Sequence, residues 1–337
     1  MTGNTRRWSR LSLAGTGGSV LLVLFLGALP YLVGLATIDS LVDLFILAIL
    51  ASTWNLLAGY GGMVSVGQQA YIGIGAYALV TLGDPLGLNV LFAVPLAAVV
   101  GALIAVPVSF LAFRLVGGYF AIGTWVIAEV FRLFTIQIPQ VGGGAGISLG
   151  ALSELPRDLR IATGYWIALA AVVVTVVACV LLVRSRFGLA LTAVRDDPVA
   201  AASSGVDVQA AKRLVFVVAG GGAGLAGALL AVSNLRVQPD GVFSVQWTAF
   251  MIFIVVIGGV GTIEGPLIGA VLFYVTRQLL ADFGSLYLIG LGIVGVLFVL
   301  FAPRGVWGLV SRQRRVDLFP VGYRLDLDRE TAARRQR

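Results

Sequence analysis

The sequence RSRFGLALTAVRDDPVAAASSGVDVQAAKR, residues Arg184–Arg213, is the one long polar interruption of this chain that has a clear structural pattern. It separates two apolar runs, Gly164–Val183 and Leu214–Asn234. Each run reaches about the 20 residues that a helix needs to cross a bilayer. The fold therefore has to place this polar segment at one surface of a set of membrane helices.

The middle of the segment predicts one short helix. Asp197 is a good N-cap, because its carboxylate can accept hydrogen bonds from the free backbone N–H groups of the first turn. Pro198 suits the first helical position, and Gly205 can take the left-handed conformation that ends a helix. Residues Pro198–Ser204 would then form about two turns, roughly 10 Å long.

Small side chains fill this predicted helix, so it can enter a groove on another protein but cannot form a core of its own. Asp207 follows as the predicted N-cap of the next helix, which leads into the membrane. An ordinary loop with one capped helical turn is the alternative interpretation. The small residues are Ala200, Ala201, Ala202, Ser203 and Ser204.

The composition indicates an integral membrane protein. Hydrophobic residues make up 59% of the chain and charged residues only 12%. The mean hydropathy is +1.00. A soluble domain cannot bury so much apolar surface. The net charge of +7 comes from basic residues that flank the membrane runs, which indicates cytoplasmic retention of Arg and Lys rather than nucleic-acid binding.

The residue types exclude several kinds of chemistry. The chain has no histidine, which excludes His-based metal sites and Ser–His–Asp catalysis. Its one cysteine, Cys179, lies in an apolar run and is expected to be a packing residue. Its single lysine, Lys212, precedes Arg213, so the chain cannot contain the G-x-x-x-x-G-K-[ST] motif of a P-loop. If ATP drives this protein, another subunit must bind the ATP.

Counting the apolar runs predicts an all-α integral membrane protein with about ten transmembrane helices, some broken or re-entrant, and with both termini in the cytoplasm. This topology places most basic residues inside, as the positive-inside rule requires. The first two runs are Gly18–Ile38 and Leu41–Leu57. The predicted division is a cytoplasmic segment at residues 1–17, a polytopic membrane domain at 18–303 with the cytoplasmic loop 184–213, and an Arg-rich cytoplasmic tail at 304–337.

A second informative stretch is NLLAGYGGMVSVGQQAYIGIGAYA, residues Asn55–Ala78. Gly59 and Gly61 interrupt its helical pattern, and Gln68 and Gln69 follow. Broken backbone is tolerated at membrane depth only where protein or water satisfies it. The stretch therefore indicates either a polar path or close helix packing with a tight turn, and both interpretations stay open.

Charges also lie inside two apolar runs. Glu129 and Arg132 share one helical face in Gly117–Ile136, as a functional pair or as a pair that neutralises itself at the interface. Glu264 lies within the sequence GGVGTIEGP, Gly258–Pro266, which breaks another run. Its first six residues weakly resemble GGMVSV in the other broken stretch, but six residues are too few to establish a repeat.

Small residues dominate Val218–Ala231, with glycine or alanine recurring every four residues. Such spacing lets neighbouring helices approach closely. We therefore predict that this helix packs very closely against its neighbours.

The chain resembles the membrane permease subunits of ABC importers for branched-chain amino acids, the M-type partner of an H/M pair, over roughly Leu41–Pro303. Val199, Ala200, Ala201 and Gly205 fit the spacing of the general E-A-A-x-x-x-G coupling signature. The chain departs from it at Val199, where the signature has Glu, and lacks the later Ile-x-Leu-Pro, which is usual in this branch. The motifs that carry the resemblance are NLLAGYGGMVSVGQQAYIGIGAYA, GGYFAIGTWVIAEVFR, RSRFGLALTAVRDDPVAAASSGVDVQAAKR and GGVGTIEGPLIGA.

The resemblance implies two groups of site residues. The residues expected to couple the chain to an ATPase are Arg184, Arg186, Gly188, Arg195, Asp196, Asp197, Ala200, Ala201 and Gly205. The residues expected along a substrate path are Asn55, Gln68, Gln69, Tyr71, Tyr119, Glu129 and Glu264.

The resemblance also implies partners and a location. Expected partners are an H-type permease subunit, two ABC ATPase subunits that bind ATP and Mg²⁺, and an extracytoplasmic substrate-binding protein. The chain itself would have no catalytic residue, cofactor, metal or nucleic acid, and would lie among lipids as a multi-pass protein of a bacterial plasma membrane. It would move leucine, isoleucine or valine by alternating access.

Two other functions stay open. Urea or short-chain amides are alternative substrates within the same branch. An ion-coupled secondary transporter is an alternative class, for which Glu129 and Glu264 are the intramembrane carboxylates available.

Overall fold

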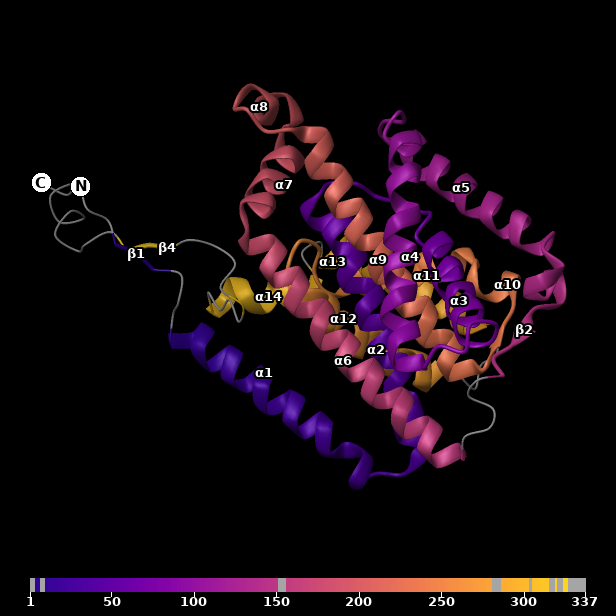
Figure 1. The fold of residues 1–337 in the computed structure, drawn as a ribbon. Helices are drawn as coiled ribbons and strands as arrows, with labels where there is room; N and C mark the ends of the chain where they lie inside the picture. The colour runs from indigo at the N-terminus through magenta and orange to yellow at the C-terminus, as the bar shows by residue number, and fades with distance from the viewer. Residues whose placement is uncertain are drawn as a thin grey trace, which may run out of the picture.

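The computed structural model describes residues 4–6, 10–150, 156–280, 286–302, 305–314, 319 and 324–326. The chain is folded mainly as helices, with two short strand pairs (Figure 1). The α-helices are α1 (Arg10–Ala28), α2 (Leu35–Asn55), α3 (Gln69–Gly83), α4 (Val90–Ala112), α5 (Gly118–Ile136), α6 (Arg157–Arg184), α7 (Arg186–Asp196), α8 (Pro198–Ser203), α9 (Val208–Asn234), α10 (Pro239–Val242), α11 (Val245–Gly258), α12 (Glu264–Leu280), α13 (Leu286–Phe301) and α14 (Gly305–Arg314).

Both strand pairs are antiparallel and join distant parts of the chain. β1 (Asn4–Arg6) pairs with β4 (Arg324–Asp326), which brings the two ends of the chain together. β2 (Ile147–Ser148) pairs with β3 (Arg236–Val237), which joins the connection after α5 to the end of α9.

Helix α9 lies at the centre of the bundle, against α2, α3 and α4. A β-carbon on Gly227 would overlap the carbonyl oxygen of Ile72 in α3, and one on Gly75 would overlap the carbonyl oxygen of Gly224. Hydrogen is therefore the only side chain that fits where these backbones cross. The predicted close packing of α9 is confirmed.

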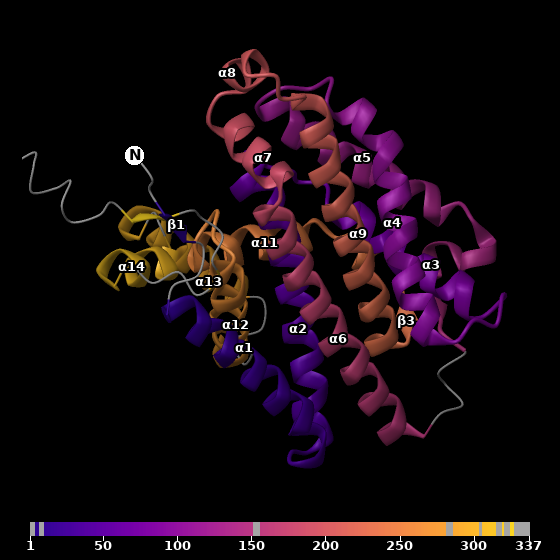
Figure 2. The same ribbon diagram turned by 60° about the vertical axis from the view of Figure 1, so that its left-hand side comes forward.

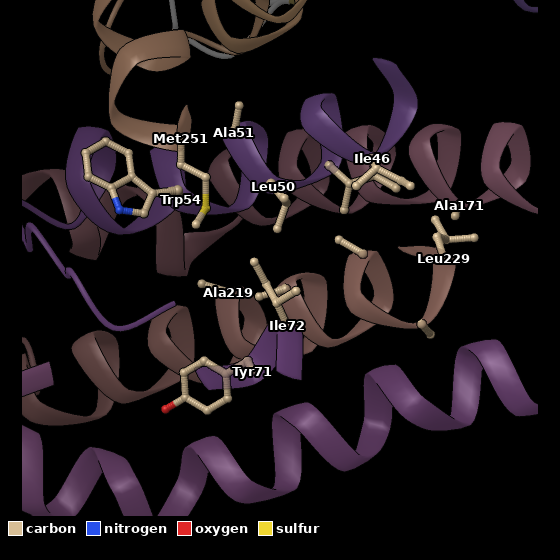
Figure 3. Close-up of a cluster of buried hydrophobic side chains, with 14 of the residues drawn as sticks. Ile46, Leu50, Ala51, Trp54, Tyr71, Ile72, Ala171, Ala219, Leu229 and Met251 are labelled. Atoms are coloured by element: carbon tan, nitrogen blue, oxygen red, sulfur yellow. The ribbon is translucent and has the colours of Figure 1, made fainter. Parts of the chain in front are cut away.

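Helix α2 forms the other half of the core and packs against α6 as well as α9. Its second half is buried continuously from Phe45 to Asn55. Figure 3 shows side chains from α2, α3, α9 and α11 in one buried cluster, including Leu50, Ile72, Ala219 and Met251.

Within the part of the chain that the structure describes, six helices are long and apolar enough to cross a membrane, so the chain is a multi-pass, all-α membrane protein. Two shorter apolar helices cover Gly15–Tyr31 and Gln69–Gly83. The count of ten crossings and the cytoplasmic placement of the termini stay predictions. The six spans are Leu35–Tyr60, Val90–Ala112, Gly118–Ile136, Arg157–Arg184, Val208–Asn234 and Pro239–Gly258.

The predicted boundary between the first two membrane runs is wrong. The first helix ends at Ala28 rather than Ile38, a 3₁₀ turn covers Leu29–Tyr31, and α2 begins at Leu35. Pro30 lies in that turn, where its missing N–H and fixed φ stop the α-helix.

The two predicted helix breaks are present. After α2, residues Leu56–Tyr60 form a π-helical turn, and an irregular segment leads to α3. The other break separates α11 from α12, and Glu264 is the first residue of α12 rather than a residue of the break. The prediction of an Arg-rich tail at 304–337 falls mostly outside the described residues.

Candidate functional site

The polar segment Arg184–Arg213 folds into two short helices before α9 begins. Sequence reasoning predicted α8 but missed α7, which follows α6 directly. Two signals identify α7: Ser185 accepts a hydrogen bond from the Phe187 N–H at 3.2 Å, and the buried residues recur every three positions. These buried residues are Gly188, Leu191 and Val194.

Helix α8 has the predicted N-cap. Asp197 accepts hydrogen bonds from the backbone N–H groups of Val199 and Ala200, at 2.8 and 3.0 Å. Asp207 likewise accepts a bond from the Ala210 N–H at 2.9 Å and caps α9. Both capping predictions are confirmed.

The end of α8 is a Schellman motif. Gly205 has φ +83°, in the left-handed region. The Val206 N–H donates to the Ala201 carbonyl at 3.1 Å, and the Gly205 N–H donates to the Ala202 carbonyl at 3.0 Å. The helix therefore stops at the predicted glycine, with Ser204 as its C-cap.

Helix α8 projects from one end of the bundle, above α7, in both views (Figures 1 and 2). Of its residues only Ala201 is buried, while Val199 is 76% exposed. Ala200 is exposed. This short, small-faced helix is held rigidly by its two caps, and its outer face is available to another protein.

The flanking residues fix α7 against α6. A β-carbon on Gly188 would overlap the carbonyl oxygen of Val183, so the chain turns back closely there. Arg184 is the last residue of α6, and the Arg186 guanidinium lies 5.3 Å from the centre of the Phe187 ring.

Arg195 and Asn55 bring the polar segment to the two helix breaks. Arg195 donates to the Gly59 carbonyl at 2.9 Å and pairs with Asp196 at 3.0 Å. The Asn55 amide donates to the Thr262 carbonyl at 2.8 Å and accepts from the Gly261 N–H at 2.9 Å. Sequence reasoning named Asn55 and Arg195 but gave no reason to bring them together.

Three polar residues at the start of α3 are buried. Gln68 and Gln69 are each 1% exposed, and Tyr71 is 2% exposed. Gln69 accepts a hydrogen bond from the hydroxyl of Thr248 in α11. The Gln68 amide nitrogen and the Tyr71 hydroxyl have no hydrogen-bond partner among the described residues. Leaving such buried groups unsatisfied is costly, so the region favours water or another polar molecule.

The charged residues predicted for the substrate path lie on α5 and at the start of α12. Glu129 pairs with Arg132 on α5, and Arg132 also pairs with Asp240 of α10, each at 2.5 Å. Tyr119, on the same helix, is 75% exposed. Glu264 is buried and accepts a hydrogen bond from the Phe319 N–H at 3.0 Å.

The seven predicted path residues lie on several elements, and their role in a path stays a prediction. Asn55 and Glu264 adjoin the break between α11 and α12. Gln68, Gln69 and Tyr71 are buried at the start of α3, and Tyr119 and Glu129 lie on α5.

Comparison with known proteins gives one family and several relatives. The family described as "Branched-chain amino acid transport system / permease component" matches residues 36–302. The high-affinity branched-chain amino acid transport system permease protein LivM of Escherichia coli K12 is 27% identical, over 88% of this chain and 76% of the relative. LivM of Salmonella typhimurium is 28% identical, over 89% and 78%.

A more distant relative is the probable branched-chain amino acid transport permease protein LivH of Methanocaldococcus jannaschii. It is 24% identical, over 72% of this chain and 82% of the relative. No solved structure matches the chain.

Proposed function

This chain belongs to the family of branched-chain amino acid transport system permease components, and from that premise we propose that it is the membrane subunit of an ATP-binding-cassette importer. It would move leucine, isoleucine or valine, because the relatives are permeases of branched-chain amino acid transport systems. The setting would be a bacterial plasma membrane.

The observation that supports an external ATPase is the exposed helix α8. It is capped at both ends, has a small outer face and stands at one end of the bundle (Figure 1). The chain lacks a P-loop lysine motif, so the ATP and Mg²⁺ would be held by two partner ATPase subunits. Helix α8 would dock in a groove of one of them, with Ala200 and Gly205 at the contact, while Ala201, which was also expected there, is buried on the inner face of the helix.

The transport cycle would be alternating access. Closure of the ATPase pair would move α8, and this chain and an H-type permease would open to the outside, where a binding protein delivers the amino acid. The chain would make no covalent change in the substrate. Among the predicted path residues, Gln68 and Tyr71 have the strongest support, because their unpartnered polar groups could bond a polar molecule.

The test is uptake of labelled leucine and labelled urea by cells with and without this chain, each with and without ATP depletion. We expect ATP-dependent leucine uptake that disappears with the chain and is blocked by vanadate. If only urea uptake is lost, the proposed substrate changes from leucine to urea, and the assignment as an importer stands. Uptake that persists without ATP and collapses with an ionophore would instead identify an ion-coupled transporter and refute the proposal.

A further inference from the structure

We propose that Arg195 and Asn55 form a joint that carries the movement of α7 and α8 to both broken membrane segments, the one after α2 and the one between α11 and α12. The inference rests on the proposed function and deepens it, because it assigns the residues that connect the ATPase-facing helices to the membrane helices. The joint consists of Arg195, Asn55, Gly59, Gly261 and Thr262.

The first half of the joint connects α7 to the break after α2. The guanidinium of Arg195 donates to the Gly59 carbonyl at 2.9 Å, in the π-helical turn Leu56–Tyr60. Its other nitrogens bond Asp196, at 3.0 and 3.1 Å. The planar guanidinium can bond both at once because its five donors are fixed in one fork.

Asp196 extends this connection toward α8. It is the last residue of α7, and the next residue, Asp197, caps α8. Asp197 alone therefore separates Asp196, which bonds the guanidinium, from the first residue of the docking helix. A displacement of α8 moves Arg195 almost directly, because so few residues lie between them.

The second half of the joint ties the two breaks to each other. The Asn55 side chain is 1% exposed, and both ends of its amide are used. It donates to the Thr262 carbonyl and accepts from the Gly261 N–H. An aspartate could not donate to that carbonyl, and a leucine could make neither bond, so the position requires an amide.

Close packing prevents the two breaks and the Arg195 side chain from moving independently of one another. A β-carbon on Gly59 would lie 2.5 Å from the Gly261 nitrogen, and one on Gly62 would lie 3.0 Å from Cγ of Arg195. The two breaks and the Arg195 side chain thus touch without intervening side chains. A displacement of Arg195 is transmitted to the backbone of both breaks, because closely packed protein has a low compressibility.

Each break leads directly into a membrane helix. The segment after Gly59 continues to α3, which carries Gln68 at its N-cap and Gln69 at its first position. The segment after Thr262 continues to α12, which packs against α2 and α11. The joint therefore connects α8 with the helix that bears the buried polar residues, and only the tertiary structure brings these parts together.

The experiment uses the complete importer in liposomes, with this chain, its partner permease, the ATPase subunits and the binding protein. Two quantities are measured: ATP hydrolysis stimulated by leucine-loaded binding protein, and uptake of labelled leucine. For Arg195→Ala we expect hydrolysis within about twofold of wild type and uptake lowered at least about tenfold, since the Gly59 carbonyl loses its bond to a charged donor. Arg114→Ala, which removes an exposed guanidinium between α4 and α5, is the matched control and should leave both quantities unchanged.

Further variants separate a joint from a merely structural role. Arg195→Lys keeps a donor and should recover at least about threefold more uptake than Arg195→Ala. Asn55→Leu combined with Arg195→Ala should lower uptake no further than the more severe single variant, because both act through one joint. Asn55 is buried, so the decision rests on Arg195, whose side chain is 39% exposed.

Several results would overturn the joint. They are normal uptake by Arg195→Ala, loss of hydrolysis and uptake together from an assembled Arg195→Ala complex, and losses that multiply in the double variant. Failure of the proposed function gives a different result. A wild-type complex that takes up urea but not leucine refutes the proposed substrate alone, and the variants are then compared by their uptake of urea. A wild-type complex with no ATP-driven uptake of either overturns both proposals.

Discussion

Gly205 shows how a single residue can define the docking helix. It has φ +83° and nothing within 4 Å of where a β-carbon would stand, so the cost of a side chain there is conformational and not steric crowding. Left-handed backbone costs an ordinary residue roughly 1–2 kcal/mol, and asparagine tolerates it better than most. The buried polar residues of α3 differ from Gly205, because their role depends on contacts with residues that are distant in the sequence.

The residue-scale prediction concerns this glycine. Gly205→Val should lower uptake by about five- to thirty-fold, the range that 1–2 kcal/mol corresponds to, because α8 can no longer end where it does. Less ATPase subunit should copurify with the variant. Gly205→Asn, the comparison variant, should retain more of both. Wild-type uptake by Gly205→Val would refute the docking role of α8, provided that the variant reaches the membrane in normal amount.

At the scale of elements, the central feature is helix α9, whose small residues allow the neighbouring helices to pack closely against it. Helix α9 crosses α3 and α4 with backbone close to backbone, at Gly227 and Ile72 and also at Gly101 and Gly220. Van der Waals packing of this kind drives helix association in membranes, where the hydrophobic effect between helices is absent. The broken segments are the second feature, and their backbone groups are satisfied by protein: the Trp54 indole donates to the Ser65 carbonyl at 2.9 Å.

The element-scale prediction is a test of this packing. Gly227→Leu should destabilise the protein by at least about 1–3 kcal/mol, the usual cost of overpacking, because Ile72 of α3 must move away. Gly292→Leu, in α13, is the matched control, since nothing lies within 4 Å of its β-carbon position. Thermal unfolding in detergent and the monodisperse fraction measure the difference. Equal stability of the two variants would contradict the packing argument.

The whole molecule has two distinct ends. Helices α7 and α8 stand at one end, and the start of α6 lies at the other, in both views (Figures 1 and 2). The positive-inside rule predicts that the α8 end faces the cytoplasm. Docking of an ATPase on α8 requires the same orientation.

The whole-molecule prediction is therefore one of sidedness. In a Cys179→Ala background, Ser203→Cys on α8 should react with a membrane-impermeant maleimide only in inverted vesicles. Gly241→Cys, in α10, which follows the end of α9 opposite α8, should react only in intact spheroplasts. Both positions are exposed, so labelling reports the side of the membrane. Labelling of Ser203→Cys from outside would reverse the topology and exclude docking of α8 on a cytoplasmic ATPase.

The sequence by itself determined the features that depend on neighbours along the chain. Composition and run length specify a membrane protein, because a bilayer requires long apolar helices with internal hydrogen bonds. The caps of α8 and the close packing of α9 follow from Asp197, Gly205 and glycine spacing, and the structure confirms them. A break between α11 and α12 was predicted too, but Glu264, which was expected inside the break, begins α12. Helix α7 and the turn at Pro30 had local signals too, in Ser185 and in the proline itself, but were missed.

Only the tertiary structure decided which distant residues meet. Asn55 and Thr262 are 207 residues apart, and Arg195 and Gly59 are 136 apart, yet each pair shares a hydrogen bond. No periodicity or capping rule encodes such a pair, because its geometry depends on how α2, α7 and α11 pack around one another. For the same reason the sequence could name polar residues for a path but could not show which of them make contacts with other elements.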